Sequence, residues 1–349
     1  MEDLSNELFY EIFDYLDACD LYEAFSNLNN RFQNLLTHSS FSLKVNLSSN
    51  AEATLEDRCQ HVIIPNMYRI CSLYLENDSF IGDFFDQCRI DSSFHRLRSI
   101  VLNDISKDRV LVVLSYLNSL PQLSSLTTIL EDDWYYDISN IYRIIFRFPC
   151  LTYSRVSVSE QQESDISVPM SINEKPSTIT HLVMNFDCTL EELTSLLLHT
   201  PHLQYLSCGH LLVTKNDEFI RDEERLALPN LTHISIGSCR IDFDLFETFI
   251  KKISSQLRKL RLTTYSYFEY LDADRWKQLI KRHMPCLSEF HFEGHHLLDD
   301  DTPFNDGSIS LFTSSFWTER QWFFEVKYTF DEWIYSIHPQ RYFGKDISK

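Results

Sequence analysis

Glycine is scarce in this chain of 349 residues, which contains only six. Phosphate-binding loops need clustered glycines, because their backbone N–H groups must approach the ligand closely. The glycines here are dispersed: Gly82, Gly209, Gly237, Gly294, Gly307 and Gly344. This argues against a P-loop or a dinucleotide-binding fold. The chain also lacks a nucleophile elbow and an HExxH motif. We therefore expect no catalytic residues, no cofactor and no enzymatic activity.

Basic residues are outnumbered, since Lys and Arg total 31 against 51 Asp and Glu, a formal net charge of -20. Such a chain repels phosphate backbones and anionic lipid surfaces, so we expect neither nucleic acid nor a membrane as partner. No stretch approaches the roughly eighteen uninterrupted apolar residues of a membrane span. The acidic start MEDLSNE lacks the basic region of a signal peptide. These features favour a cytoplasmic or nuclear protein.

Motifs for metal binding and redox chemistry are missing as well, because the nine cysteines form no CxxC pair. An odd, scattered set without a signal sequence indicates reduced thiols, most of them packed as small hydrophobic side chains. His291, His295, His296 and the acidic run 299–301 contain groups that can ligate a metal ion. Their spacing matches no tight metal-binding motif, so we predict no metal site.

The first forty residues show the period of amphipathic helices. The first period is marked by Leu4, Leu8, Ile12, Phe13 and Leu16. Ser5 or Asn6 can cap its start. A second period covers residues 21–36, with Asp20 as its expected N-cap. A piece this short buries too little surface to be stable alone, so it must pack on the next domain, on a partner or on both.

This stretch resembles an F-box, whose pattern opens Leu-Pro-x-Glu and continues through Ile-Phe-x-x-Leu and Asp-Leu to a Trp followed by Leu. The matching residues are Leu4, Glu7, Ile12, Phe13, Leu16, Asp20, Leu21, Phe32 and Leu35. Ser5 stands where the family usually has Pro, and Phe32 where it usually has Trp. The resemblance implies docking on a Skp-type adaptor through Leu4, Leu8, Ile12, Leu16 and Leu21. The alternative is a helical cap that shields the first edge of a repeat array.

An apolar-x-x-apolar-x-apolar pattern recurs nine times in the rest of the chain. Its first positions are Ile70, Leu97, Leu123, Leu151, Ile179, Leu203, Leu231, Leu257 and Leu287, which lie 24 to 30 residues apart. Each copy predicts a short strand with one buried face, and several gaps carry a helical period. The predicted helices span residues 110–117, 138–148, 190–198, 243–257 and 276–284. Thr189 and Glu192 have the spacing of a capping box.

A strand plus a helix at this period resembles the leucine-rich repeat family over about residues 41–295. The family's Asn or Cys beyond the last anchor is matched clearly only at Cys239. The predicted fold class is therefore α/β, in three segments. Residues 1–40 form an F-box-like helical module, residues 41–295 an irregular leucine-rich repeat solenoid of parallel strands and helices, and residues 296–349 a C-terminal cap and tail.

Aromatic residues crowd together between positions 304 and 343. The alternation of Phe324, Val326, Tyr328 and Phe330 predicts a half-buried strand. We interpret the segment as an aromatic cap on the last repeat, and an exposed patch that recognises a partner is the alternative. Residues 157–178 and the charged run 214–225 interrupt the repeats and are expected to be exposed loops.

Residues between the apolar anchors of each strand should point away from the core. On this basis the predicted substrate-binding row is Tyr153, Arg155, His181, Tyr205, His233, Lys259 and Arg261. The same rule places Tyr74, Glu76, Asn103, Asn185, Glu289, His291 and Glu293 on this face. Aromatic, amide and charged side chains in a row suit protein recognition. The alternative is that some of them only decorate a solvated sheet.

The two resemblances together imply a substrate-recognition subunit of an SCF-type E3 ubiquitin ligase. The F-box would dock on the adaptor, which bridges to a cullin, and the repeats would hold an unknown client protein for degradation. Such a subunit acts by proximity and performs no chemistry itself. One alternative is a leucine-rich repeat interaction scaffold unrelated to ubiquitination. Another, from a different class, is an enzyme with its site on the strand face.

Overall fold

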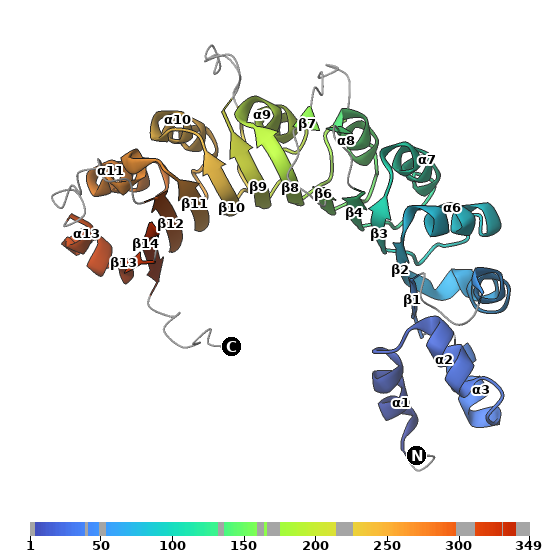
Figure 1. Cartoon of the computed structure of the whole chain (residues 1–349). Helices are drawn as coiled ribbons and strands as arrows, with labels where there is room; N and C mark the ends of the chain where they lie inside the picture. Colours follow the sequence, from blue (N-terminus) through green and yellow to red (C-terminus); the bar gives the residue numbers. More distant parts are fainter. Residues whose placement is uncertain are drawn as a thin grey trace. The chain divides into compact units, whose positions relative to one another are not determined.

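The computed structural model describes residues 4–38, 41–48, 54–131, 136–158, 164–165, 175–213, 226–297, 311–329 and 331–339. The chain divides into two compact units, residues 1–160 and 161–349. Each unit combines a sheet of mostly parallel strands with helices, so the predicted α/β class is confirmed (Figure 1). The boundary between the units falls inside the segment that the sequence predicts as one repeat array.

Three short helices open the first unit: α1 (Asn6–Phe13), α2 (Ala18–Phe25) and α3 (Asn30–Thr37). Their shared core is aromatic. The ring centroids of Phe9 and Phe32 lie 5.0 Å apart, as do those of Phe13 and Phe25. Aromatic pairs at this distance contribute about 0.5–1.5 kcal/mol each beyond their buried area. Phe9 and Phe13 thus fix α1 on the other two helices.

Two details of this segment differ from the expectations. The continuous helical period expected over residues 21–36 is two helices, because Asn27 adopts a left-handed conformation with φ of 70°. The N-cap of α2 is Asp17, three residues earlier than expected, and its carboxylate accepts hydrogen bonds from the first turn. Ser5 caps α1, one of the two caps expected there.

Five parallel strands form the sheet of the first unit, in the order β1-β2-β3-β4-β6. They are β1 (Leu43–Leu47), β2 (Ile70–Glu76), β3 (Ser99–Ile105), β4 (Ser125–Leu130) and β6 (Tyr153–Val158), and β5 (Tyr136–Asp137) is a two-residue strand. The last four strands of the sheet coincide with the first four copies of the sequence pattern. Strand β1 adds a strand that the pattern misses.

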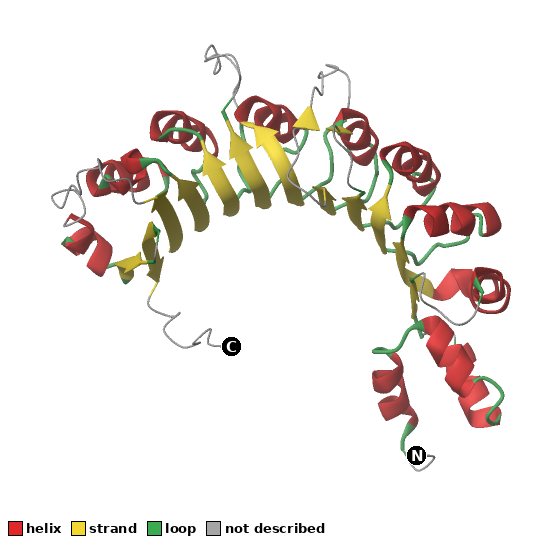
Figure 2. Ribbon diagram, in the orientation of Figure 1, coloured by secondary structure: helices red, strands yellow, loops and turns green. Residues whose placement is uncertain are grey.

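Helices connect these strands and cover one face of the sheet (Figure 2). A helical stretch precedes β2 and consists of α4 (Leu55–Arg58), the π-helical turn η1 (Cys59–Ile63), α5 (Ile64–Asn66) and the 3-10 turn η2 (Met67–Arg69). The later connections hold α6 (Asp78–Gln87), α7 (Lys107–Leu117) and α8 (Ser139–Ile145). Helices α7 and α8 confirm two predicted helices, whereas α6 and the stretch before β2 were not predicted.

Arg69 joins the three-helix segment to the first strands, and its side chain is fully buried. One guanidinium nitrogen donates to the carbonyl oxygens of Leu36 at 2.6 Å and His38 at 3.1 Å. The other donates to the Tyr22 hydroxyl at 2.8 Å and to Asn66 Oδ1 at 2.6 Å. A buried charge needs such compensation. Three of these bonds tie α2 and the end of α3 to the chain entering β2, and the fourth, to Asn66, stays within that chain segment.

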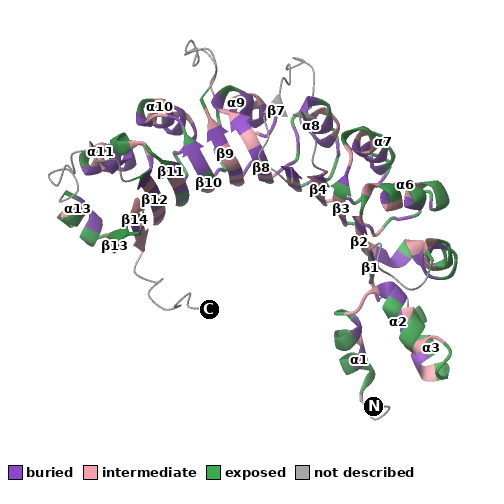
Figure 3. Cartoon of the chain, in the orientation of Figure 1, coloured by how far each residue is buried: buried purple, intermediate pink, exposed green. Residues whose placement is uncertain are grey.

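The second unit repeats the same plan. Its strands are β8 (His181–Thr189), β9 (Tyr205–Leu212), β10 (His233–Arg240), β11 (Lys259–Tyr265) and β12 (Glu289–Leu297), which pair in parallel, and β7 (Ser164–Asp165) is a two-residue strand. The five parallel strands coincide with the remaining copies of the pattern. Buried residues alternate with exposed or half-buried ones along them (Figure 3).

Helices also cover one face of the second unit's sheet (Figure 2). They are α9 (Leu190–Leu198), α10 (Phe243–Ile253), the 3-10 turn η3 (Phe268–Leu271) and α11 (Ala273–His283). All three α-helices match predicted ones, and Thr189 and Glu192 form the predicted capping box at α9. Trp276 is one of the three buried tryptophans described in this unit, and its indole N–H donates to the Tyr270 carbonyl oxygen at 2.8 Å.

The C-terminal segment completes the sheet. Strand β14 (Glu332–Pro339) pairs antiparallel with β12, and β13 (Trp322–Tyr328) pairs with β14. The predicted strand is confirmed, but its predicted half-buried face is wrong at Val326 and Tyr328, which are exposed, and Phe330 lies outside the described residues. The turn η4 (Leu311–Thr313) and helix α13 (Ser315–Thr318) precede them. The rings of Trp317 and Trp322 lie 6.2 and 5.7 Å from that of Phe290 in β12. Aromatic side chains thus cover the end of the second unit's core.

The two expected loops fall largely outside the part of the chain that the structure describes. In the loop expected over residues 157–178, residues 159–163 and 166–174 are not described, and the loop expected over residues 214–225 is not described at all. Among the described residues, no helix combines the length and the apolar character needed to cross a membrane.

Candidate functional site

The outer face of α1 exposes apolar side chains. Leu8 is 45% exposed, Ile12 42% and Tyr15, just beyond the helix, 91%. With Leu4 and Glu11 they line a shallow hollow. Residues four apart lie on one face of a helix, so Leu8 and Ile12 form a stripe, and Leu4, which precedes the helix, lines the same hollow. The stripe faces away from the aromatic core, because α1 has already buried Phe9 and Phe13 on its other side.

The structure brings together three of the five predicted adaptor contacts, Leu4, Leu8 and Ile12. Leu16 is half-buried and does not line the hollow. Leu21 is only 1% exposed, so it is buried inside the chain and the predicted contact of its side chain with a partner is wrong. Tyr15 belongs to the exposed face and was missed, although its spacing from Leu8 and Glu11 matches the helical period.

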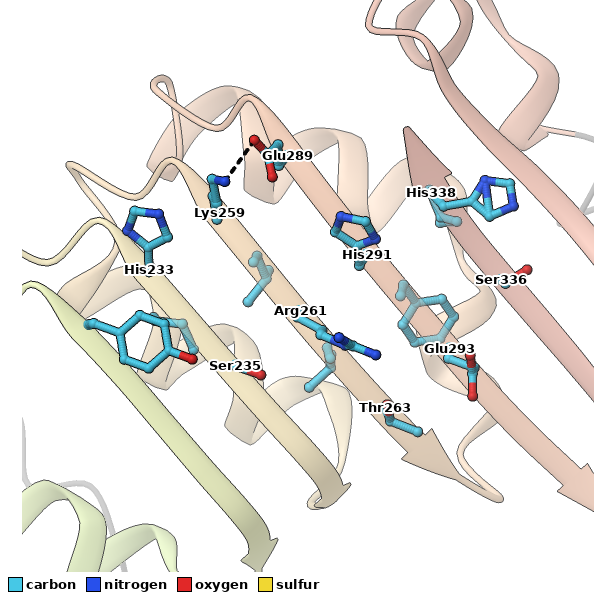
Figure 4. A pocket seen from close by; sticks show the side chains of 16 residues that line it. His233, Ser235, Lys259, Arg261, Thr263, Glu289, His291, Glu293, Ser336 and His338 are labelled. Atoms are coloured by element: carbon cyan, nitrogen blue, oxygen red, sulfur yellow. Dashed lines mark ion pairs between the residues drawn. The ribbon is translucent and has the colours of Figure 1, made fainter. Parts of the chain in front are cut away.

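A groove of about 400 Å³ lies on the strand face of the second unit, opposite its helices (Figure 4). Side chains from β9, β10, β11, β12 and β14 line it. Parallel register places equivalent residues of neighbouring strands side by side, so that the side chains form rows. Figure 4 shows His233, Lys259 and Glu289 in one such row and Ser235, Arg261 and His291 in the next.

The first row continues onto β8 and β9 as a ladder of rings. The rings of His181 and Tyr205 stack with centroids 5.8 Å apart, and those of Tyr205 and His233 lie 6.1 Å apart. At the other end of the row, Lys259 Nζ lies 2.9 Å from Glu289 Oε1. The row thus presents aromatic surface first and a neutralised ion pair beyond it.

The second row contains a cation with no such partner. Arg261 is exposed, and among the described residues no carboxylate lies within ion-pair distance of its guanidinium. Burial and the positive charge of Arg261 lower the pKa of neighbouring His291. Burial and the charge of Lys259 likewise lower the pKa of His233. Both imidazoles are therefore mostly neutral at pH 7 and can offer a hydrogen bond without adding charge.

Four of the seven predicted substrate-binding residues, Tyr205, His233, Lys259 and Arg261, line this groove, and His181 stacks against its edge. The other two, Tyr153 and Arg155, lie half-exposed on β6 of the first unit. Tyr74, Glu76 and Asn103 are also half-exposed there, and Asn185 is exposed in the second unit.

Ser336 and His338 of β14 complete one wall of the groove and were missed. Their strand runs antiparallel to β12 and carries no copy of the repeat pattern, so the pattern could not place them. The alternation of Trp333, Tyr335 and Ile337 in the sequence was an available signal for this strand.

The histidines considered as metal ligands do not converge. His291 and His295 lie on the outward face of β12, whereas His296 is buried on its other face, and residues 299–301 lie outside the described part. Among the described residues, no three His, Cys, Asp or Glu side chains are arranged to hold a metal ion.

Comparison of the chain with protein-family models and with curated proteins finds no match. The function must therefore be argued from the two surfaces themselves. One is the apolar face of α1, and the other is the polar groove on the strand face of the second unit.

Proposed function

We propose that the chain is the substrate-recognition subunit of an SCF-type E3 ubiquitin ligase. In this proposal residues 1–40 are an F-box that docks on a Skp-type adaptor and through it on a cullin. The strands and helices that follow are leucine-rich repeats that hold the client protein. The chain would act in the cytoplasm or nucleus by bringing its client near the ubiquitin donor, with no catalytic residue of its own.

The exposed apolar stripe of α1 carries this proposal. A helix that only capped the repeats would need one apolar face, and Phe9 and Phe13 already supply it. Leu8 and Ile12 form a second apolar face that remains 45% and 42% exposed in the described part of the chain. Burying a whole Leu or Ile side chain contributes about 1.5–3 kcal/mol. Covering this stripe with a partner helix would therefore stabilise a complex.

Binding of the purified chain to a recombinant Skp-type adaptor tests the proposal, measured by isothermal titration calorimetry. The double variant Leu8→Asp plus Ile12→Asp should bind at least about 100-fold more weakly, because the stripe loses its apolar contacts and two carboxylates would be buried. Val112→Asp is the matched control, since Val112 is a half-exposed apolar residue on α7 of the same unit. It should bind as the wild type does.

Two outcomes would contradict the ligase function. One is a wild-type chain with no affinity for the adaptor. The other is a Leu8→Asp plus Ile12→Asp variant that binds as tightly as the wild type while its circular dichroism is unchanged. Either result would favour the alternative of a repeat scaffold unrelated to ubiquitination, for which the exposed strand face alone is sufficient.

A further inference from the structure

We infer that the groove on the strand face of the second unit binds an extended peptide segment that carries an Asp or Glu, whose carboxylate pairs with Arg261. The inference rests on the proposed function only in assigning this peptide to a client protein. The binding itself needs no adaptor.

Arg261 supplies the recognition. Its guanidinium is exposed on β11, and among the described residues no carboxylate is within ion-pair reach of it. A guanidinium presents parallel N–H donors that match the two oxygens of a carboxylate. Ser235 and His291 flank Arg261 in register on the neighbouring strands. The position therefore combines a cation with small and mostly neutral polar neighbours.

The carboxylates that line the groove decide between a carboxylate and a phosphate ligand. Lys259 pairs with Glu289 at 2.9 Å, whereas Glu293 lies 2.8 Å from His295, an imidazole that also contacts Glu332 and that neutralises a carboxylate only when it is protonated. Arg261 is the cation of the described groove with no carboxylate within ion-pair distance, and it balances at most one negative charge. A phosphate group carries about -1.5 to -2 at neutral pH, so its excess charge would face Glu289 and Glu293. The charge balance favours the singly charged carboxylate.

The surroundings of Arg261 indicate an extended peptide. The groove crosses several strands, and the His181–Tyr205–His233 ladder lies beside it as a flat surface on which neighbouring side chains can stack. The chain carries a net charge of -20, which repels acidic segments at long range. An acidic peptide therefore binds only where a local cation faces it, and the binding of such a peptide to this groove depends on Arg261.

Peptide binding to the full chain tests the inference. Three pools of labelled nine-residue peptides would differ only at the central position, which is Asp, Asn or phosphoserine, with the flanking positions randomised. The Asp pool should be enriched over the Asn pool. Individual Asp peptides from it should bind about 10- to 100-fold more tightly than their Asn versions, the range of one charge-assisted hydrogen-bonded pair.

Two variants locate the effect. Arg261→Gln should abolish the difference between Asp and Asn peptides. Arg282→Gln, the same change on the exposed surface of α11, should leave it intact. Glu289→Gln releases Lys259 from its ion pair and gives the groove a second available cation. That variant should bind phosphoserine peptides at least about tenfold more tightly than the wild type, because two cations can balance a dianion.

Several results would overturn the inference. The wild type would retain no peptides from any pool, would retain the Asp and Asn pools equally, or would prefer phosphoserine over Asp. The fourth such result is an Arg261→Gln variant that distinguishes Asp from Asn peptides as the wild type does. Adaptor binding is measured on the same samples. Arg261→Gln should leave it intact and Leu8→Asp plus Ile12→Asp should leave peptide binding intact, so failure of one proposal is distinguishable from failure of the other.

Discussion

Replacing Arg69 with Met should loosen the helical module from the first strands. The variant keeps an unbranched side chain of similar length but loses all four hydrogen bonds of the guanidinium. Tyr22 and Asn66 retain a partner, because the Tyr22 hydroxyl also donates to Asn66 Oδ1 at 2.8 Å. The His38 carbonyl oxygen keeps the backbone N–H of Phe41 as a donor at 3.1 Å, so the loss falls mainly on the carbonyl group of Leu36. Each buried acceptor left without a donor costs about 1–3 kcal/mol.

The net effect lies toward the lower end of this range, because the Met variant no longer has a guanidinium to desolvate. We expect a loss of about 1–2 kcal/mol in the free energy that holds α2 and α3 in place. A tenfold change in an equilibrium constant corresponds to about 1.4 kcal/mol, so protected amides in these helices should exchange about 5- to 30-fold faster with deuterium.

Hydrogen exchange of the full chain, followed by mass spectrometry, resolves this effect by segment. Peptides covering residues 18–37 should respond, whereas peptides from the second unit should not. Arg98→Met is the control, since the Arg98 side chain is exposed in the same unit. Exchange in α2 and α3 that changes less than about threefold in the Arg69→Met variant would refute the role of Arg69 as the link.

Two further predictions concern the core of the second unit. Burial lowers the pKa of His296 from 6.5 to about 4. Between these pH values the imidazole is protonated in the unfolded state but not in the folded state, so the free energy of unfolding decreases as the pH falls below about 6.5. His296→Phe should remove about 2 kcal/mol of the loss between pH 7.5 and pH 5, measured by urea unfolding with tryptophan fluorescence, and an identical loss in both proteins would contradict this. Trp276→Ala should cost about 3–5 kcal/mol in the same assay at pH 7.5, because it empties a site enclosed by Phe243, Phe246 and Phe290, and a cost below about 1 kcal/mol would show that the core refills the space.

The strands were predictable because their signal is local. All nine copies of the apolar pattern coincide with strands, including the weak copies at Leu123 and Leu151. Alternation of this kind has one physical explanation, a strand with one buried face, so degeneracy elsewhere in the repeat did not obscure it. Copies aligned on Leu257 and Leu287 also place Lys259 beside Glu289, as the structure does.

Features that depend on tertiary contacts were harder to predict. The segment before β2 mixes α, π and 3-10 turns and buries Arg69, so no single period describes it. Helix α6 was different: Phe80, Ile81 and Phe84 follow a helical spacing, and this available signal was overlooked. The sequence also could not predict that Arg261 has no carboxylate within ion-pair distance among the described residues. This depends on which carboxylate side chains lie close to which cationic side chains across the groove.

The α1 helix shows why a helical period alone does not assign a binding face. Its sequence contains two apolar pairs at a spacing of four, Leu8-Ile12 and Phe9-Phe13, and the helical period accommodates both. Only the packing of α2 and α3 decides that the phenylalanines are the inner stripe. Exposing the remaining aliphatic stripe to water has a cost and no benefit to the isolated chain. A cap for the repeats would not need it, whereas a docking helix would, and this difference is what favours an adaptor-binding module over a plain cap.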